Sequence, residues 1–113
     1  MSFDIVVFDE NYRYYKQLHL HAIIQKALFR KLITATEYPY LHKAADDKED
    51  LVYELDDVPF LKADVEKLEK YLETEKLMAA EIKNTCLTFV RALKDACDGA
   101  IEKNRGIDFI AGE

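Results

Sequence analysis

The sequence contains few of the residues that build flexible linkers, crosslinks or membrane spans. Its 113 residues include three glycines, two prolines, two cysteines and no tryptophan. The chain has a length typical of one domain, and its sequence contains no linker-like segment. We therefore expect a single domain covering residues 1–113. The longest apolar run near the start, Ile5–Phe8, is far shorter than the roughly 20 residues of a membrane span. No signal-like segment opens the sequence, so we predict a cytoplasmic protein that does not bind membranes.

Positive charge is also scarce where the negative charge is densest. The whole chain has 16 basic and 22 acidic residues, a net charge of -6, which disfavours direct nucleic-acid binding. Residues 36–75 hold 13 acidic and 5 basic side chains, whereas residues 1–35 carry a small positive excess and residues 76–113 are balanced. The negative charge of residues 36–75 therefore predicts that this part of the chain forms a surface that binds a basic partner.

Hydrophobic periodicity predicts an α+β fold in which helices dominate. We expect three helices, at about residues 11–34, 58–74 and 77–104, and a small sheet formed by residues 3–8, 38–42, 51–55 and 107–110. The helix at 77–104 has the longest apolar stripe and should form the spine of the core, with Gly99 allowing a close approach and Gly106 ending the helix. The strand at 107–110 is expected to pair with residues 3–8.

The first and middle segments are assigned by weaker patterns. Residues 11–34 lack glycine and proline, and Leu20, Ile24 and Leu28 recur at helical spacing. Residues 38–42 and 51–55 flank a polar acidic stretch, which predicts a hairpin with a long tip.

The sequence offers no recognisable metal site. His19 and His21 would share one face of a strand, but on the predicted helix their imidazoles point apart, because two residues turn a helix by about 200°. The acidic stretch from Asp46 fails as a calcium loop, since Leu51 occupies the position that requires glycine. We therefore predict neither metal nor cofactor.

Motifs for catalysis are missing as well. The chain contains no G-x-S-x-G, no glycine-rich phosphate loop and no H-E-x-x-H, and Ser2 is its single serine. Cys86 and Cys97, 11 residues apart in the sequence, would lie about 16 Å apart on one helix, beyond the reach of a disulfide. We predict a non-enzymatic protein with two buried thiols.

Tyrosines accompany the acidic third, and tyrosine is a frequent anchor of protein interfaces. Carboxylates would steer a basic protein to this surface, and the rings would supply fixed contacts. The predicted partner-binding residues within 36–75 are Tyr38, Tyr40, Asp46, Asp47, Glu49, Asp50, Tyr53, Glu54, Asp56 and Asp57.

The order of elements also resembles a known kind of protein. A strand and a long helix are followed by Tyr38-Pro39-Tyr40-Leu41, an acidic turn, a helix start at Val58-Pro59-Phe60-Leu61, a long helix and a terminal segment from Gly106 to Gly112. This order resembles small uncharacterised bacterial α+β proteins, some of which resemble the immunity partners of secreted toxins. The resemblance implies an inhibitory, partner-binding role and carries no catalytic residue.

A second hypothesis is a soluble helical domain with a structural or small-ligand-binding role, in which the charge serves only solubility. The two hypotheses differ in whether tyrosines and carboxylates share one exposed face. The predicted core is large enough for a stable monomer, so homo-oligomerisation is permitted but not required.

Overall fold

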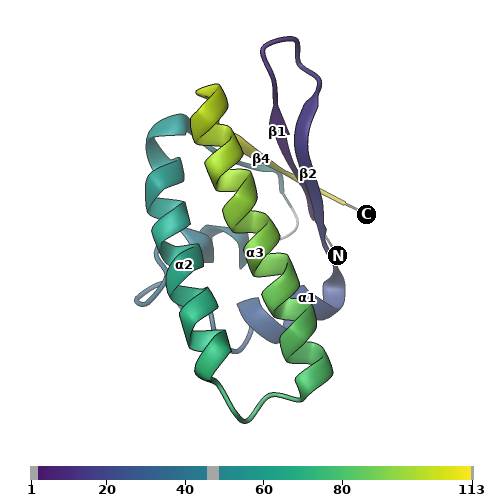
Figure 1. Ribbon diagram of the computed structural model, residues 1–113, viewed down its shortest axis with the longest axis vertical. Helices are drawn as coiled ribbons and strands as arrows, with labels where there is room; N and C mark the ends of the chain where they lie inside the picture. Colours follow the sequence, from purple (N-terminus) through teal and green to yellow (C-terminus); the bar gives the residue numbers. More distant parts are fainter. Residues whose placement is uncertain (1–2, 46–48, 113) are drawn as a thin grey trace.

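The computed structural model describes residues 3–45 and 49–112, and it has the predicted helix-dominated α+β architecture. Figure 1 shows the elements in their spatial arrangement. In chain order they are β1 (Phe3–Phe8), β2 (Tyr14–Leu20), α1 (Ala22–Phe29), the 3-10 helix η1 (Leu41–Ala45), β3 (Leu51–Tyr53), the 3-10 helix η2 (Leu55–Asp57), α2 (Val58–Thr74), α3 (Ala80–Lys103) and β4 (Ile107–Ala111). Within the described ranges, none of the helices combines the length and hydrophobicity that a membrane span requires.

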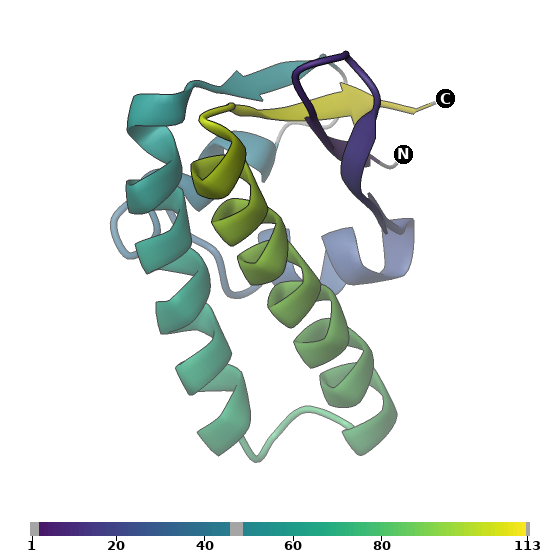
Figure 2. The same cartoon turned by 45° about the horizontal axis from the view of Figure 1, so that its top comes forward.

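The four strands form one antiparallel sheet in the order β2-β1-β4-β3. The predicted pairing of the last strand with the first is confirmed, with Ile5 opposite Phe109. Alternate residues of β1 and β4 point into the core, where Phe3, Ile5 and Phe109 are fully buried. The long helices cover this inner face and leave the outer face open (Figure 2).

The predicted helices at 58–74 and 77–104 are confirmed as α2 and α3, although α3 begins at Ala80. The seam of α2, from Val58 to Leu72, is buried against α3. Gly99 on α3 provides the expected close approach, since the side chains of Tyr15 and Lys16 on β2 lie over it. Asn104, with φ of 54°, rather than Gly106 takes the left-handed position that ends α3.

The predicted helix at 11–34 is wrong over its first half, which forms the strand β2. A tight connection explains the difference. The Asp9 side chain accepts hydrogen bonds from the backbone N–H groups of Asn11 and Arg13, and these bonds lower the pKa of its carboxyl. The turn directs residues 14–20 back along β1, where tyrosine and leucine suit a strand. Only Ala22–Phe29 is helical.

The predicted strand at 38–42 is also wrong, and so is its hairpin with residues 51–55. Residues 35–37 and 39–40 form turns, and η1 follows from Leu41. Asp64 on α2 holds this segment, because its Oδ2 accepts hydrogen bonds from the N–H groups of Tyr40 at 2.8 Å and Leu41 at 3.0 Å. The strand predicted at 51–55 is confirmed only as Leu51–Tyr53, and it pairs with β4.

Alkaline pH is expected to destabilise the fold through Cys97. Burial raises the pKa of this thiol from 9.0 to about 12. Above pH 9 the thiol ionises in the unfolded chain but stays neutral in the fold, so stability is complete below pH 9 and is lost as the pH rises towards 12. Between pH 8 and pH 10 the free energy of unfolding should fall by about 1.4 kcal/mol from this group.

Urea denaturation at the two pH values measures the loss, with Cys97→Ala as the comparison. The variant should show a pH-dependent loss smaller by that amount, whatever its stability at pH 8. An equal loss in both proteins would show that the thiol is not the cause.

Candidate functional site

Two of the predicted partner-binding tyrosines serve the core. Tyr38 and Tyr53 have exposed fractions of 5% and 1%, which corrects their prediction as surface anchors. The Tyr53 hydroxyl donates a 2.6 Å hydrogen bond to the Tyr40 carbonyl oxygen, and burial raises the pKa of that hydroxyl well above its ordinary range. The half-buried Tyr40 ring stacks on the Phe60 ring, with 5.1 Å between the ring centroids. These rings hold residues 38–45 against the helices.

Several carboxylates of residues 36–75 are also occupied within the protein. Glu37 pairs with Lys67 at 2.6 Å, and Glu69 pairs with Lys94 at 2.6 Å and Arg91 at 3.0 Å. These hydrogen bonds lower the pKa values of Glu37 and Glu69. Together with Asp64, they show that the middle third is not one uniform acidic surface.

Five carboxylates of residues 36–75 lie on or beside β3 and η2. In residues 3–45 and 49–112, no lysine or arginine nitrogen lies within 4.0 Å of the carboxylates of Glu49, Asp50, Glu54, Asp56 or Asp57. The Asp50 side chain additionally accepts a hydrogen bond from the N–H of Ala111 at 2.8 Å. The predicted residues Asp46 and Asp47 lie outside the described residues.

Asp108 on β4 adds a sixth unpaired carboxylate to this group, because it is likewise without an ion-pair partner in the described chain. It lies opposite Val52 of β3 on the outer face of the sheet. Burial and the negative charges of Glu54 and Asp50 raise the pKa of its carboxyl. Glu54 and Asp50 are therefore close enough to Asp108 to disfavour its negative charge.

Aromatic side chains border these carboxylates around a shallow hollow of about 190 Å³. Tyr12, at the tip of the β1–β2 hairpin, is 76% exposed, and the Arg105 guanidinium lies over its ring at 5.2 Å. We name this region the acidic sheet surface and define it as Phe8, Tyr12, Asp50, Val52, Glu54, Arg105, Gly106 and Asp108.

Sequence reasoning missed the aromatic half of this surface. Tyr12 and Tyr14 were expected at the head of a helix, whereas they lie at the hairpin tip and on β2, where Tyr14 contacts Phe8. The Tyr14-Tyr15 pair was the available signal, because adjacent aromatic residues favour a strand. The hollow offers the carboxylates of Glu54 and Asp108 and an aromatic rim that already holds the Arg105 guanidinium, a combination that suits a lysine or arginine side chain.

The prediction that His19 and His21 lie on a helix with their imidazoles pointing apart is wrong. His19 lies on β2 and His21 directly after it, and their rings are in contact, with centroids 4.4 Å apart. The His19 Nδ1 lies 2.6 Å from the Asp4 Oδ1. Over the described ranges, no group of three or more His, Cys, Asp or Glu side chains is arranged to hold a metal ion.

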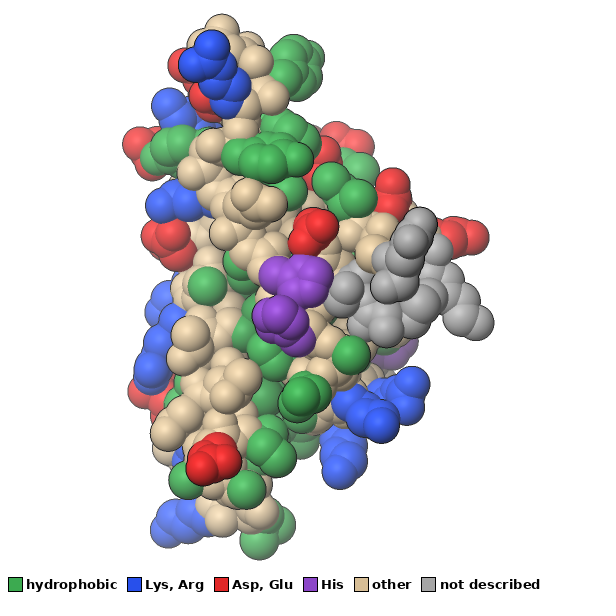
Figure 3. All heavy atoms as spheres, turned by 90° about the vertical axis from the view of Figure 1, so that its right-hand side faces the viewer, with side chains coloured by type: hydrophobic (Ala, Val, Ile, Leu, Met, Phe, Trp, Pro, Cys, Tyr) green, Lys and Arg blue, Asp and Glu red, His purple; other side chains and the backbone are tan. Residues whose placement is uncertain are grey.

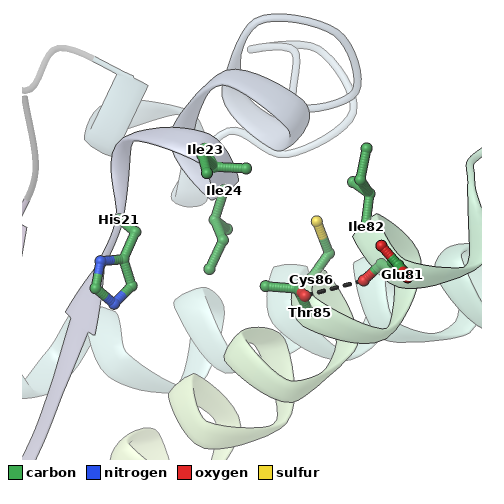
Figure 4. A pocket seen from close by; sticks show the side chains of 7 residues that line it. All are labelled: His21, Ile23, Ile24, Glu81, Ile82, Thr85 and Cys86. Atoms are coloured by element: carbon green, nitrogen blue, oxygen red, sulfur yellow. Dashed lines mark hydrogen bonds between the residues drawn. The ribbon is translucent and has the colours of Figure 1, made fainter.

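The histidines border a second recess, which we name the β2 groove and define as Leu18, Ile23, Ile24, Ile82, Cys86 and Phe89. On the molecular surface, histidine side chains adjoin hydrophobic ones at this face, and lysine and arginine side chains gather beside them (Figure 3). Figure 4 shows His21 and the isoleucines of α1 on one side of the recess and Ile82 and Cys86 of α3 on the other.

Comparison with known proteins leaves the function to be argued from these two surfaces. No family model, curated protein or solved structure matches this chain. The resemblance to small bacterial α+β proteins with immunity-like members therefore stays a prediction.

Proposed function

We propose that this chain is a non-enzymatic protein-binding domain that holds a basic partner on its acidic sheet surface. The observation that carries the proposal is a group of carboxylates, without ion-pair partners among the described residues, beside the exposed Tyr12 ring on a sheet face that none of the described helices covers. Isolated surface charges need no partner to explain them. A partly buried carboxylate that faces two other carboxylates, as Asp108 does, calls for an explanation.

A cationic side chain in the hollow would relieve that repulsion. Burial and, after it, the negative charges of Glu54 and Asp50 raise the pKa of Asp108, so a lysine or arginine between these groups would meet a favourable potential. The Tyr12 ring already accepts the Arg105 guanidinium, the kind of contact that an incoming arginine would also make. Charge would steer the encounter, and the rings of Phe8 and Tyr12 would supply buried contact area.

An inhibitory role fits this mode of binding. A nucleic-acid-degrading toxin presents a basic surface to its substrate, and an acidic domain can cover that surface without entering the reaction. We therefore include an immunity or inhibitor role in the proposal. The net charge of -6 argues against competition through direct binding of nucleic acid by this chain.

The proposal predicts that Glu54→Gln/Asp108→Asn weakens the binding of basic peptides. The probes are short fluorescent peptides in which lysine and arginine alternate with valine and threonine, and fluorescence anisotropy measures their dissociation constants. Loss of two contacting carboxylates should raise the dissociation constant about tenfold at low ionic strength. The wild-type affinity should also fall as salt is added.

A matched variant controls for net charge. Glu66→Gln/Glu81→Gln removes the same charge from exposed carboxylates on α2 and α3 without touching the acidic sheet surface. It should bind the basic peptides nearly as well as the wild type. Equal weakening in the two variants, or no binding of basic peptides by the wild type, would overturn the proposal.

A further inference from the structure

The strand β2 has an unpaired edge. It is the outermost strand on its side of the sheet and pairs only with β1. Outside the sheet, none of the backbone hydrogen bonds found in residues 3–45 and 49–112 involves residues 14–20. An edge of seven residues presents alternate N–H and C=O groups that another extended chain can pair with.

The β2 groove runs beside this edge. Leu18 of β2 and Phe89 of α3 belong to one hollow of about 350 Å³, and Ile24 also lines an adjoining hollow of about 310 Å³ with Ile82. Isoleucine is exposed here to an unusual degree, 72% for Ile23 and 42% for Ile82. Contiguous apolar surface of this kind marks an interaction site more often than isolated exposed residues do.

The charge beside the groove has the opposite sign to that of the acidic sheet surface. Lys26, Arg30 and Lys31 on and after α1 are exposed, and none has a carboxylate within 4.0 Å in the part of the chain that the structure describes. Lys26 and Lys31 line a further hollow with Ile23 and Ile82. Among the residues lining these hollows, Glu81 is the single carboxylate.

We propose that the β2 groove binds an extended acidic segment of a partner protein. The segment pairs with the free edge of β2 as a fifth strand, and every second side chain, which is apolar, enters the recess between α1 and α3. Where the segment continues past the end of β2 and leaves the sheet, its carboxylates reach Lys26, Arg30 and Lys31 on and after α1. An extended segment fits better than a helix because it alone satisfies the unpaired backbone groups of β2.

This surface is independent of the one proposed above. β2 and β3 are the two edges of the sheet, so the groove and the carboxylates around β3 lie at opposite ends of its strand order. The two surfaces select segments of opposite charge, and one molecule can therefore hold two partners at once. Either proposal can fail without the other.

The test uses the full chain and a fluorescent peptide that alternates valine with glutamate. Lys26→Glu/Lys31→Glu should raise its dissociation constant about tenfold, because two attractive charges become repulsive. Lys70→Glu/Lys76→Glu makes the same change in net charge at two exposed lysines on and after α2. Neither lysine has a carboxylate within 4.0 Å among the described residues, and the change should have little effect. A peptide that alternates valine with lysine should bind elsewhere, unaffected by either pair.

A second pair of variants tests the apolar contact. Ile82 and Ile101 are both on α3 and have nearly equal exposed fractions, 42% and 40%, so the two serine variants should be similarly stable. Ile82→Ser should weaken binding of the valine–glutamate peptide several-fold, and Ile101→Ser should leave it unchanged. Equal effects of the two serine variants would count against the groove.

Hydrogen exchange distinguishes the mode of binding. With the peptide bound, amides of residues 14–20 that exchange freely in the unbound protein should become protected. Binding without that protection, or tighter binding of a peptide with the same composition at helical spacing, would overturn strand addition. Sedimentation of the protein alone supplies a further check, since a dimer that protects residues 14–20 would make a second copy the occupant.

Discussion

Replacing Gly106 with alanine is expected to lower the free energy of unfolding by about 3 kcal/mol. Gly106 joins α3 to β4, and an added Cβ would overlap the carbonyl oxygen of Tyr53 and crowd the Cα of Glu54. Both obstacles are backbone atoms, so no change of rotamer can relieve the overlap. Either β3 or the start of β4 has to move, which disturbs the pairing between Tyr53 and Ile107.

Gly99→Ala provides the comparison for this variant. A Cβ at residue 99 would meet the Cγ of Lys16 at 2.9 Å and the Tyr15 ring at 3.2 Å, which are side-chain atoms and can shift more readily than backbone. This crowding offsets the gain in helix propensity from alanine, about 1 kcal/mol. Chemical denaturation of both variants should therefore show a large loss for Gly106→Ala and a change near zero for Gly99→Ala. Similar stabilities for the two variants would contradict the close approach at Gly106.

Replacing Asp64 with alanine is expected to cost about 3 kcal/mol as well. The Asp64 carboxylate accepts the N–H groups of Tyr40 and Leu41, which then lack a partner in a largely buried position. The loss should spread along residues 38–45, because these two bonds connect that segment to α2. Relative to the wild type, the variant should therefore show a larger increase in amide hydrogen exchange at residues 38–45 than at the centre of α3.

Two further variants separate the hydrogen bonds from charge. Asp64→Asn keeps one carbonyl oxygen as an acceptor and should lose roughly half as much stability as the alanine variant. Asp98→Ala removes a carboxylate from the exposed ion pair with Lys62 and should change the free energy of unfolding by less than about 1 kcal/mol. If Asp64→Ala were as mild as Asp98→Ala, the segment would depend on other contacts.

The helices at 58–74 and 80–103 were predictable because their signals are local. Their apolar residues recur at helical spacing over many turns, and Pro59 is confirmed within the first turn of α2. The strand at 107–111 was predictable from the apolar–polar–apolar pattern of residues 107–109 directly after a helix end. In each case the buried face could be read from neighbouring residues alone.

The segments that were predicted wrongly depend on distant residues. Leu18, Leu20 and Ile24 fit helical spacing and strand alternation alike, and pairing with β1 decides between the two. Residues 38–42 have the composition of a strand, but hydrogen bonds to the Asp64 carboxylate set their conformation. Asp64 lies more than 20 residues later in the sequence. A single sequence contains no signal for either contact.

The candidate site was predictable in part for the same reason. Counting charges located the acidic third of the sequence. Within it, the structure limits the candidate site to the carboxylates from Glu49 to Asp57 that have no ion-pair partner among the described residues, and Asp108 of β4 joins them. Sequence distance concealed Asp108 and Tyr12, because β-sheet pairing brings them to that surface. Alternation could have identified Asp108 as outward-facing once residues 107–110 were assigned to a strand.

The place of β4 in the sheet has a consequence for biosynthesis. β4 lies between β1 and β3, so its residues supply one side of the pairing for a strand formed about 100 positions earlier in the chain. During translation the β1–β2 hairpin and the helices can form first, but β1 keeps an edge of unpaired backbone N–H and C=O groups until residue 111 has left the ribosome. Contacts at such long sequence separation slow folding, and the nascent chain is therefore most exposed to aggregation just before synthesis reaches β4.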